Sequence, residues 1–381
     1  MIFFTLLFIV ILAYKSIKRY NRLFNPFTLS IQIPLLFLTV PQSILVLIGV
    51  GEDSILSDSV ILLFVLCIYI GTFIKIPAIK ISEFKHKKTI RYIITLIIIL
   101  LFIIMLPMLI SYGLSLQGLR AFYENIVFSP LASIYQVSKT LLSILIIFLF
   151  IKNKKVTIPI LVFVAILFLS GSKMAILSTA ILLAVTYEEY GNINYKKLIS
   201  IFIILFIFLI FYHYAQSIYA EDKGVLMNAL SYFDIYDQQT KALNMFINGE
   251  LGYFHGDISL SSWYKIIPRF IWENKPKDYG FALLNYAIYP EYAASGWMPS
   301  FGLAYTFADF GFYSIILSGL IVGLSKNYLY KLFKKNNKSI ATFLLYMFSI
   351  DIVIFLLFIL FYFISSLKDD TSNNSLLLVK Q

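Results

Sequence analysis

One stretch of the chain alternates cations with aromatic side chains: "IPRFIWENKPKDYG", residues 267–280. Aromatic rings stack on the apolar faces of sugars, and lysine and arginine pair with phosphates. The pattern therefore predicts a binding site for a sugar phosphate, with Trp272 against the sugar. Its cationic residues are Arg269, Lys275 and Lys277. The alternative is an aromatic belt at a membrane–water interface, which has no role in chemistry.

A second candidate is a lysine in a small polar turn. Lys173 ends "SGSK", residues 170–173, which interrupts an apolar run. A lysine at the centre of a bilayer costs about 2.5–3.5 kcal/mol on insertion scales, so its presence suggests a function. The turn, with Ser170 and Ser172, is predicted to line an aqueous funnel open to the outside, where irregular backbone is tolerated. In the alternative, the turn is a simple loop and Lys173 extends to the outer headgroups.

Acid–base chemistry has few candidates. His255 and Asp257 are neighbours in "YFHGDIS", and either is a candidate for a general base. Asp351 and Lys139 lie inside apolar runs, and we expect them to pair with each other. The sequence has no phosphate-binding glycine loop and no cysteine–histidine set spaced for a metal. We therefore predict no cofactor and no metal.

The composition indicates the class of protein that holds these residues. Mean hydropathy is +0.85 and charged residues make up 13% of the chain. Apolar runs of about 20 residues recur along it, which predicts an all-α, polytopic membrane protein. The single cysteine, Cys67, excludes a disulfide framework. The N-terminus lacks a basic region and a small-residue cleavage site, so we expect a retained first span rather than a signal peptide.

About ten transmembrane helices are predicted. They lie at residues 1–14, 27–50, 59–79, 90–112, 129–151, 157–170, 173–187, 198–215, 301–324 and 340–366. Of the 31 lysines and arginines, 20 fall around alternate loops, after the odd-numbered spans. Since cytoplasmic loops carry the excess of lysine and arginine, both termini are predicted outside. The positive charge is therefore a topology signal, and nucleic acid is not expected as a partner.

This topology depends on residues 156–187. As one continuous helix they would reach about 48 Å at 1.5 Å per residue, which is longer than one crossing requires. Two full crossings would need about 40 residues, which is more than the segment has. A single crossing would invert every later loop and leave the lysines of 326–338 outside. Two short helices broken at "SGSK" agree better with the charges.

These spans divide the chain into three parts. They are an N-terminal membrane bundle at 1–215 with a broken pair at 157–187, a large outer loop at 216–300, and the last two spans with the tail at 301–381. The outer loop holds all three tryptophans, among them Trp263, a second candidate for stacking on sugar. Its segment 223–249 has apolar residues at helical spacing and ends at Gly249, so we expect a helix over the membrane domain.

Three motifs carry a resemblance to a known family. "SGSK", "IPRFIWENKPK" and "PSFGLAYTFADFGFYSIILSGLIVGL" (residues 299–324), in this order and spacing, resemble the Wzy-type O-antigen and oligosaccharide repeat-unit polymerases. Two positions differ from the family pattern. Lys173 stands where the family commonly has arginine, and Ala304 stands where an acidic residue often precedes the tyrosine. The resemblance implies a membrane glycosyltransferase with a GT-C-like architecture.

The resemblance also implies a reaction. A polymer on undecaprenyl diphosphate is transferred onto the sugar of another lipid-linked repeat unit, on the outer side of the bacterial inner membrane, to build O-antigen or capsular polysaccharide. No nucleotide sugar exists there, so the donor carries its own leaving group. The partners implied are the lipid-linked donor and acceptor, membrane lipids and a regulator of chain length.

Fixed cations can neutralise the charge that develops on a leaving diphosphate. Lys173, Arg269 and Arg120 are the outward-facing candidates. Each charge-assisted hydrogen bond contributes about 1.5–3 kcal/mol, so two or three would offset the insertion cost of Lys173. The proton of the acceptor hydroxyl would go to His255 or Asp257.

Three other functions remain open. An O-antigen ligase differs only in its acceptor, and the sequence barely separates the two. A flippase or transporter of lipid-linked oligosaccharide should show internal repeats or paired broken helices, whereas this chain has one break and no repeat. A metal-dependent lipid-sugar glycosyltransferase would use acids in the first outer loop, "GEDSILSD", namely Glu52, Asp53 and Asp58.

Overall fold

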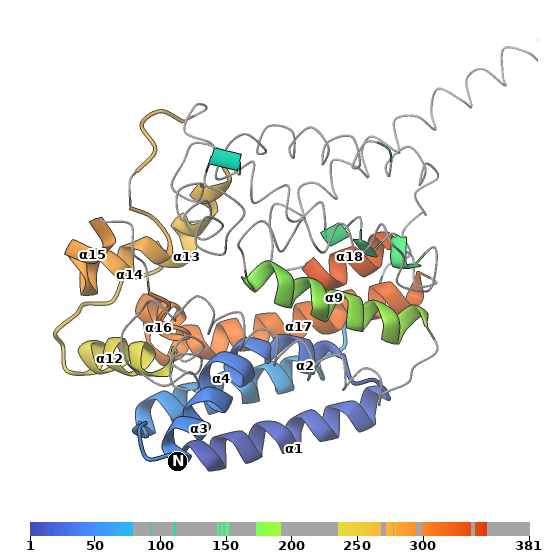
Figure 1. The fold of residues 1–381 in the computed structure, drawn as a ribbon, viewed down its shortest axis with the longest axis horizontal. Helices are drawn as coiled ribbons and strands as arrows, with labels where there is room; N and C mark the ends of the chain where they lie inside the picture. The colour runs from blue at the N-terminus through green and yellow to red at the C-terminus, as the bar shows by residue number, and fades with distance from the viewer. Residues whose placement is uncertain are drawn as a thin grey trace, which may run out of the picture. The chain divides into compact units, whose positions relative to one another are not determined.

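The computed structural model describes residues 1–78, 92, 110–111, parts of 143–151, 173–191, 235–267, 272–276, 278–294, 299–336 and 340–348. The chain divides into two compact units. Unit 1 comprises Met1–Pro77 and Phe206–Tyr328, and unit 2 comprises Ala78–Leu205 and Leu329–Gln381. All regular secondary structure in the described ranges is helical, which confirms the predicted all-α class for that part of the chain (Figure 1).

The helices of unit 1 come from both of its chain segments. They are α1 (Ile2–Tyr20), α2 (Pro26–Ser30), the π-helix η1 (Pro34–Thr39), α3 (Val40–Leu47), α4 (Ile55–Gly71), α12 (Tyr236–Ile247), α13 (Asp257–Ser261), the 3-10 helix η2 (Ser262–Ile266), α14 (Phe281–Ile288), α15 (Pro290–Ala294), α16 (Ala304–Phe310) and most of α17 (Phe312–Lys335). The described helices of unit 2 are α9 (Lys173–Tyr190) and α18 (Ile340–Phe348).

Within the described residues, one helix is long and apolar enough to cross a membrane: α17. Pro34–Leu47 and Ile55–Gly71 are shorter apolar helices. The predicted span 301–324 is divided in the structure, because Gly311 separates α16 from α17 with φ 61° and ψ −136°, and α17 continues to Lys335. Side chains rarely tolerate a positive φ, so a glycine ends α16 here. The number of spans and the GT-C-like architecture stay predictions.

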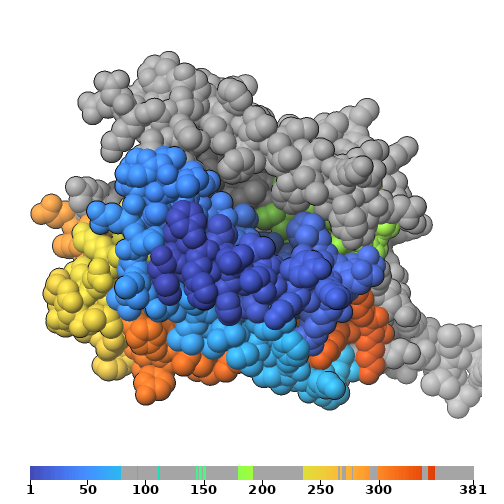
Figure 2. Space-filling view, turned by 90° about the horizontal axis from the view of Figure 1, so that it is seen from below, coloured from blue at the N-terminus to red at the C-terminus, as the bar shows by residue number. Residues whose placement is uncertain are grey.

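Helix α1 shows the apolar pattern of a helix at the edge of a bundle. Its buried residues, which recur every three or four positions, are Ile2, Thr5, Ile9, Leu12 and Ser16. Its opposite side is also apolar and exposed, with Phe4, Leu7 and Tyr14 at the surface. Figure 2 shows α1 lying uncovered across one face of the molecule. A helix that is apolar on both sides suits contact with lipid on the uncovered side.

Helices α4 and α17 approach each other closely through glycines. A Cβ atom on Gly323 would lie 2.1 Å from the backbone oxygen of Ile68, and one on Gly71 would lie 2.6 Å from that of Leu320. A Cβ on Gly319 would lie 2.8 Å from the oxygen of Phe64. Small residues allow this approach between backbones, as is common for helices packed in membranes.

The two ends of unit 1 are defined by polar contacts. At one end, the Met1 ammonium pairs with Asp53 at 2.7 Å, and the Tyr236 hydroxyl bonds the backbone of Ser54. At the other end, Tyr20 donates to Asn327 at 3.0 Å and Asn327 donates to the Ile74 oxygen at 3.2 Å. Helices α1, α4 and α17 therefore run in the same direction, and α12 lies at the end where α1 and α4 begin.

A proline leaves one carbonyl of the segment η1–α3 available to bond the residue before α12. Pro41 has no N–H to donate to the carbonyl four residues earlier, that of Phe37. This carbonyl accepts instead from the N–H of Ile235, at 3.3 Å, directly before α12 begins. Helix α12 ends before Gly249, whose φ is 74°, so the predicted end of this helix is confirmed.

In unit 2, the ends of α9 and α17 are joined by an ion pair. Lys334 donates to the carboxylate of Glu189 at 2.6 Å, and the Glu189 side chain is fully buried. The ring of Tyr190 packs edge-on against Phe343 at 5.3 Å, and Phe343 lies 5.4 Å from Phe333. The last turns of α9 and α17 and the first turn of α18 thus share one aromatic core.

Candidate functional site

Three of the predicted substrate-binding residues come together around Tyr264. The Tyr264 ring meets Trp272 edge-on at 5.0 Å and Trp263 at 4.9 Å, and lies 6.0 Å from the ring of Tyr279. The Lys275 ammonium lies 4.5 Å from the centre of the Tyr279 ring. Sequence analysis did not single out Tyr264, although its place between two tryptophans and a run of cations was visible.

Lys275 is held inside this group rather than at its surface. Its side chain is buried, with 7% of the residue exposed, and its ammonium donates to the backbone oxygen of Ile267 at 3.0 Å. The backbone N–H of Lys275 donates to the oxygen of Trp272 at 3.1 Å. The lysine therefore closes the loop that carries Trp272 and brings a positive charge beneath the aromatic rings.

The predicted bases lie on a turn directly before this group. His255 has a left-handed backbone, with φ 50°, and both His255 and Asp257 are exposed. The His255 N–H donates to the backbone oxygen of Asp309 at 3.0 Å, and that of Phe254 donates to Ala308 at 2.9 Å. This short backbone pairing fixes the turn against α16, so that α13 and η2 lead from His255 to Trp263.

Asp309 is a residue that sequence analysis missed. It is 1% exposed, and its carboxylate accepts from the N–H of Ile258 at 3.1 Å and from that of Ser259 at 3.0 Å. The Ser259 hydroxyl donates to the same carboxylate. Asp309 thus caps the first turn of α13 from a distant part of the chain. An acid inside "TFADFGF" was the available signal, and its apolar surroundings assigned it to a span.

Helix α14 is attached to the same segment by a glycine. The N–H of Gly280, whose φ is 58°, donates to the Ser261 hydroxyl at 2.7 Å. On α14, Asn285 donates to the Tyr305 hydroxyl at 3.0 Å, and Tyr305 donates to the oxygen of Pro299 at 2.8 Å. These bonds tie α13, α14 and α16 into one framework beneath the aromatic group.

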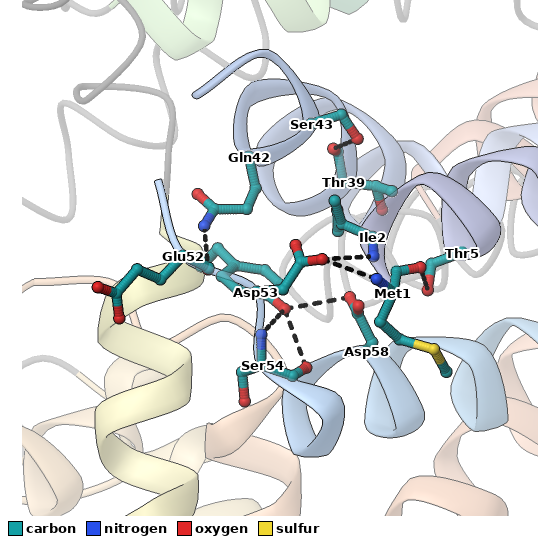
Figure 3. Close-up of polar contacts among 11 residues, drawn as sticks. Met1, Ile2, Thr5, Thr39, Gln42, Ser43, Glu52, Asp53, Ser54 and Asp58 are labelled. Carbon is teal, nitrogen blue, oxygen red and sulfur yellow. Dashed lines mark hydrogen bonds and ion pairs between the residues drawn. The ribbon is translucent and has the colours of Figure 1, made fainter. Parts of the chain in front are cut away.

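The acids of the predicted first outer loop face different partners. Asp53 pairs with the Met1 ammonium, and the Glu52 carboxylate points away from the other two acids (Figure 3). Asp58 is fully buried, and its carboxyl group lies 3.1 Å from the Tyr236 hydroxyl. Among the residues that the structure describes, no three His, Cys, Asp or Glu side chains gather closely enough to hold a metal ion. A metal site built from these acids is therefore not supported.

Burial favours the protonated form of Asp58, and the contacts of Tyr236 can accommodate that form. The hydroxyl of Tyr236 lies within hydrogen-bond distance of the Ser54 oxygen, the Ser54 N–H and Asp58. It has one hydrogen, which cannot serve both the Ser54 oxygen and a carboxylate. A protonated Asp58 can donate to Tyr236 while Tyr236 donates to Ser54. Burial raises the pKa of Asp58, which precedes the predicted span 59–79, to about 6.

Several predicted residues lie outside the described residues. They are Arg120, Ser170, Ser172, Arg269, Lys277, Lys139 and Asp351. Lys173 is the first described residue of α9, and its side chain is not described. The structure thus brings together Trp263, Trp272 and Lys275, with His255 and Asp257 on the adjoining turn, and the predicted diphosphate cations stay predictions.

Comparison with known proteins gives a match along most of the chain. The O-antigen polymerases of Salmonella typhimurium (strain LT2) and Salmonella typhi are each 28% identical to it over 379 residues, which cover 91% of this chain and 87% of each relative. No family model and no solved structure matches. The resemblance to Wzy-type O-antigen polymerases that the motifs predicted is confirmed.

Proposed function

We propose, from this similarity to O-antigen polymerases, that the chain is a membrane glycosyltransferase that joins lipid-linked oligosaccharide repeat units into O-antigen or a related polysaccharide. The observation that carries the proposal is the 28% identity to both relatives over 91% of the chain. Similarity over this length includes the spans and the outer loop together, rather than one shared motif.

The reaction assigns a task to each group of residues. The bond between the donor sugar and undecaprenyl diphosphate breaks, and a bond to a hydroxyl of the acceptor repeat unit forms. Lys173, Arg269 and Arg120 would neutralise the leaving diphosphate, and His255 or Asp257 would accept the proton of the hydroxyl. Cations that are fixed in advance lower the barrier because nothing has to reorganise as charge develops.

Trp272 is the best-supported sugar contact among the described residues. Its ring is half-buried and packs nearly perpendicular to the ring of Tyr264, and the buried Lys275 lies in the same loop. A ring held in place by its neighbours can stack on a sugar with little loss of conformational freedom. The positive charge of Lys275 would favour a sugar that carries a diphosphate.

The charges at the two ends of unit 1 support an outer position for this site. The end where α1 and α4 begin carries Glu52, Asp53, Asp58 and Asp237, whereas the opposite end carries Lys18, Arg19, Arg22 and Lys75. Basic residues gather on the cytoplasmic side of membrane proteins. Since α12 lies at the acidic end, we infer that residues 235–305 face outward.

The positions of these two ends also bear on segment 156–187, which crosses the membrane either once or as two short helices. Thr72 lies at the basic end of unit 1 and Tyr236 at the acidic end. If the chain crosses a bilayer, an odd number of crossings must separate them. The predicted spans place five crossings there, and a single crossing at 156–187 would leave four. The position of α12 therefore supports two short helices broken at "SGSK".

The decisive experiment is the glycan profile of a strain that lacks this chain. Loss of the polymerase leaves lipid-linked and surface glycans with single repeat units, and expression of the chain restores long polymers. Long polymer that stays unattached would instead identify a ligase. Absence of any glycan on the outer side would identify a flippase, and either result would overturn the proposal.

Lys173 offers a test of the diphosphate role. Lys173→Arg should retain activity, because arginine also donates to phosphate. Lys173→Ala should lower the rate of polymer formation by about a hundredfold, which corresponds to a loss of about 3 kcal/mol of transition-state stabilisation. Chain length and membrane abundance are measured together. Normal polymer from Lys173→Ala at normal abundance would contradict a catalytic role for this lysine.

A further inference from the structure

The surface around α13 is unusually apolar for a loop on the outer side of a membrane. Leu260 is 70% exposed, Phe281 58%, Phe310 50% and Trp263 48%. We call these four residues the α13 apolar surface. Large exposed apolar groups that lie together mark a site of contact with lipid or with another protein, since single exposed residues need no explanation but clusters do.

The four residues come from α13, η2, α14 and α16, and close contacts at Gly256 and Gly280 bring these elements together. Gly256 lies between two of them: a Cβ on it would be 3.4 Å from the Phe310 ring and 3.6 Å from a methyl group of Leu260. Trp263 follows Leu260 by three positions, which is close to one helical turn. Phe281 follows Gly280, whose N–H bonds the Ser261 hydroxyl.

The opposite side of α13 is fixed to the core of unit 1. Ile258 is 1% exposed and belongs to the main hydrophobic core, and Asp309 accepts hydrogen bonds from Ile258 and Ser259. The backbone N–H groups of the first turn thus have partners inside the protein, while Leu260 and Trp263 stay exposed. Leu260 and Trp263 therefore face outward as a rigid pair rather than as a mobile loop.

The α13 apolar surface continues onto the helix that is best suited to cross a membrane. Directly after Phe310 and Gly311, α17 begins with Phe312 (40% exposed) and Tyr313 (83%), and its exposed residues continue with Leu317 (61%) and Ile321 (53%). In Figure 1, where α17 runs nearly horizontally, α13 stands above the end at which α17 begins, and α12, α14 and α15 extend farther to the left.

We propose that the α13 apolar surface lies in the outer interface of the lipid bilayer, as a membrane-resting element of the outer loop. Amphipathic helices of this kind bury their apolar side about 5–10 Å into the boundary between headgroups and acyl chains. Tryptophan is enriched at that depth, because its ring is apolar and its N–H finds a polar partner. The occupant is lipid, which the continuity with α17 favours over a soluble protein.

This placement separates the roles of two tryptophans. Trp263 was predicted to bind substrate, but its place in the α13 apolar surface assigns it to lipid, and Trp272 remains for the sugar. The diphosphate of a lipid-linked substrate lies at the depth of the headgroups, so the element would hold the turn of His255 and the loop of Trp272 at that depth. The inference rests on the membrane insertion in the proposed function, and not on polymerisation.

Single-tryptophan variants test the depth directly. The chain has three tryptophans, so Trp272→Phe with Trp297→Phe leaves Trp263, and Trp263→Phe with Trp297→Phe leaves Trp272 as the matched control. Both variants are placed in bilayers that contain lipids brominated near the headgroup, and their fluorescence is compared. We expect Trp263 to be quenched several-fold more strongly than Trp272, and to be poorly quenched by aqueous iodide.

The result that overturns the proposal is the reverse pattern. Strong quenching of Trp263 by iodide, without quenching by brominated lipid, would show that the surface faces water and is free for a soluble partner. Because fluorescence is measured without substrate, this outcome would leave the proposed polymerase activity untouched. Loss of polymerase activity in a strain would likewise leave the depth measurement unaffected.

A second measurement does not depend on tryptophan substitution. Leu260→Cys and Asn248→Cys are made separately in a Cys67→Ser background, since both positions are exposed. In intact spheroplasts, Asn248→Cys should react quickly with a membrane-impermeant maleimide, and Leu260→Cys several-fold more slowly, because lipid disfavours the reactive thiolate. Equal rates at the two positions would contradict burial of the α13 apolar surface in lipid.

Discussion

The helix pair α4 and α17 and the segment 254–263 are fixed by opposite means. The pair depends on absent side chains: Gly71, Gly319 and Gly323 let two backbones approach to a distance that no Cβ would permit. Segment 254–263 depends on a buried side chain, because Asp309 holds the first turn of α13 by its carboxylate. The first region should therefore be sensitive to added volume, and the second to lost hydrogen-bonding capacity.

This difference also separates a scaffold from a site. Close backbone packing leaves no polar group unpaired and suits a region that holds spans in register. A turn held by one distant carboxylate can carry exposed residues such as His255 and Asp257 in a defined position. The candidate site is thus built on the region whose geometry depends on side-chain chemistry.

The largest effect is expected from added volume in the helix pair. Gly323→Leu would force its Cβ onto the Ile68 oxygen, 2.1 Å away, and the helices must separate. Overpacking ordinarily costs about 1–3 kcal/mol, and a clash with backbone exceeds this range. We expect loss of the protein from the membrane fraction. Ile321→Phe adds volume on the exposed side of α17 and should be tolerated. Equal abundance of the two variants would contradict the close packing.

The next effect concerns Asp309. Asp309→Ala leaves the buried N–H of Ile258 and the partly buried N–H and hydroxyl of Ser259 without their acceptor, and an unsatisfied buried group costs about 1–3 kcal/mol. Hydrogen exchange at Ile258 and Ser259 should accelerate strongly, whereas exchange in α4 should not change. Asp309→Asn keeps one acceptor and should lie between the two. Unchanged protection at Ile258 in Asp309→Ala would show that the cap does not hold α13.

Part of this comparison was visible in the sequence. Apolar runs and the lysines between them predicted helices at α1, α4 and α17, because burial and helical period leave a local pattern. The end of α12 at Gly249 was also predicted, since a left-handed residue ends a helix locally. What could not be predicted are pairs of distant residues: Asp309 bonds a residue 51 positions away, and Asp58 one 178 positions away. Nothing in one sequence indicates which distant residues meet.

The site shows the same limit. Trp263, Trp272 and Lys275 were predicted because their residue types suit sugar and phosphate, and they do come together. Residue type did not indicate that Lys275 would be buried, or that Tyr264 would stand at the centre. The separation of Trp263 from Trp272 by exposure likewise required the fold.

We expect a smaller effect from substitution of these two tryptophans, and the two substitutions should differ in their effect on chain growth. If Trp272 stacks on sugar, Trp272→Ala removes a contact of about 0.5–1.5 kcal/mol and should slow chain growth by about two- to tenfold. Trp263→Ala removes a lipid contact and should leave chain growth per enzyme molecule unchanged. Chain-length distributions are compared at matched membrane abundance. Shorter chains from Trp263→Ala alone would return that residue to the substrate.

The smallest effect concerns Asp58. If Asp58 is neutral, its contact is neither close packing through glycines nor a set of hydrogen bonds to a charged carboxylate. Below its pKa of about 6, Asp58 can donate to Tyr236, and Asn supplies a donor at the same place through its amide. Asp58→Asn should therefore change the melting temperature at pH 5 little, whereas Asp58→Ala leaves a cavity and should lower it. The pH dependence gives the sign. With its pKa raised to about 6 in the folded state, Asp58 binds a proton that the unfolded chain has already released. Stability contributed at this position should fall as the pH rises from about 4 to about 6 and stay level above.

The difference in melting temperature between the native chain and Asp58→Asn, followed from pH 4.5 to 7.5 in detergent at about half-unit steps, isolates that contribution from all other carboxylates. A difference that grows in favour of the native chain with rising pH would mean that Asp58 is ionised, and that α12 is held to α4 by a charge in the same manner as α13 is held by Asp309.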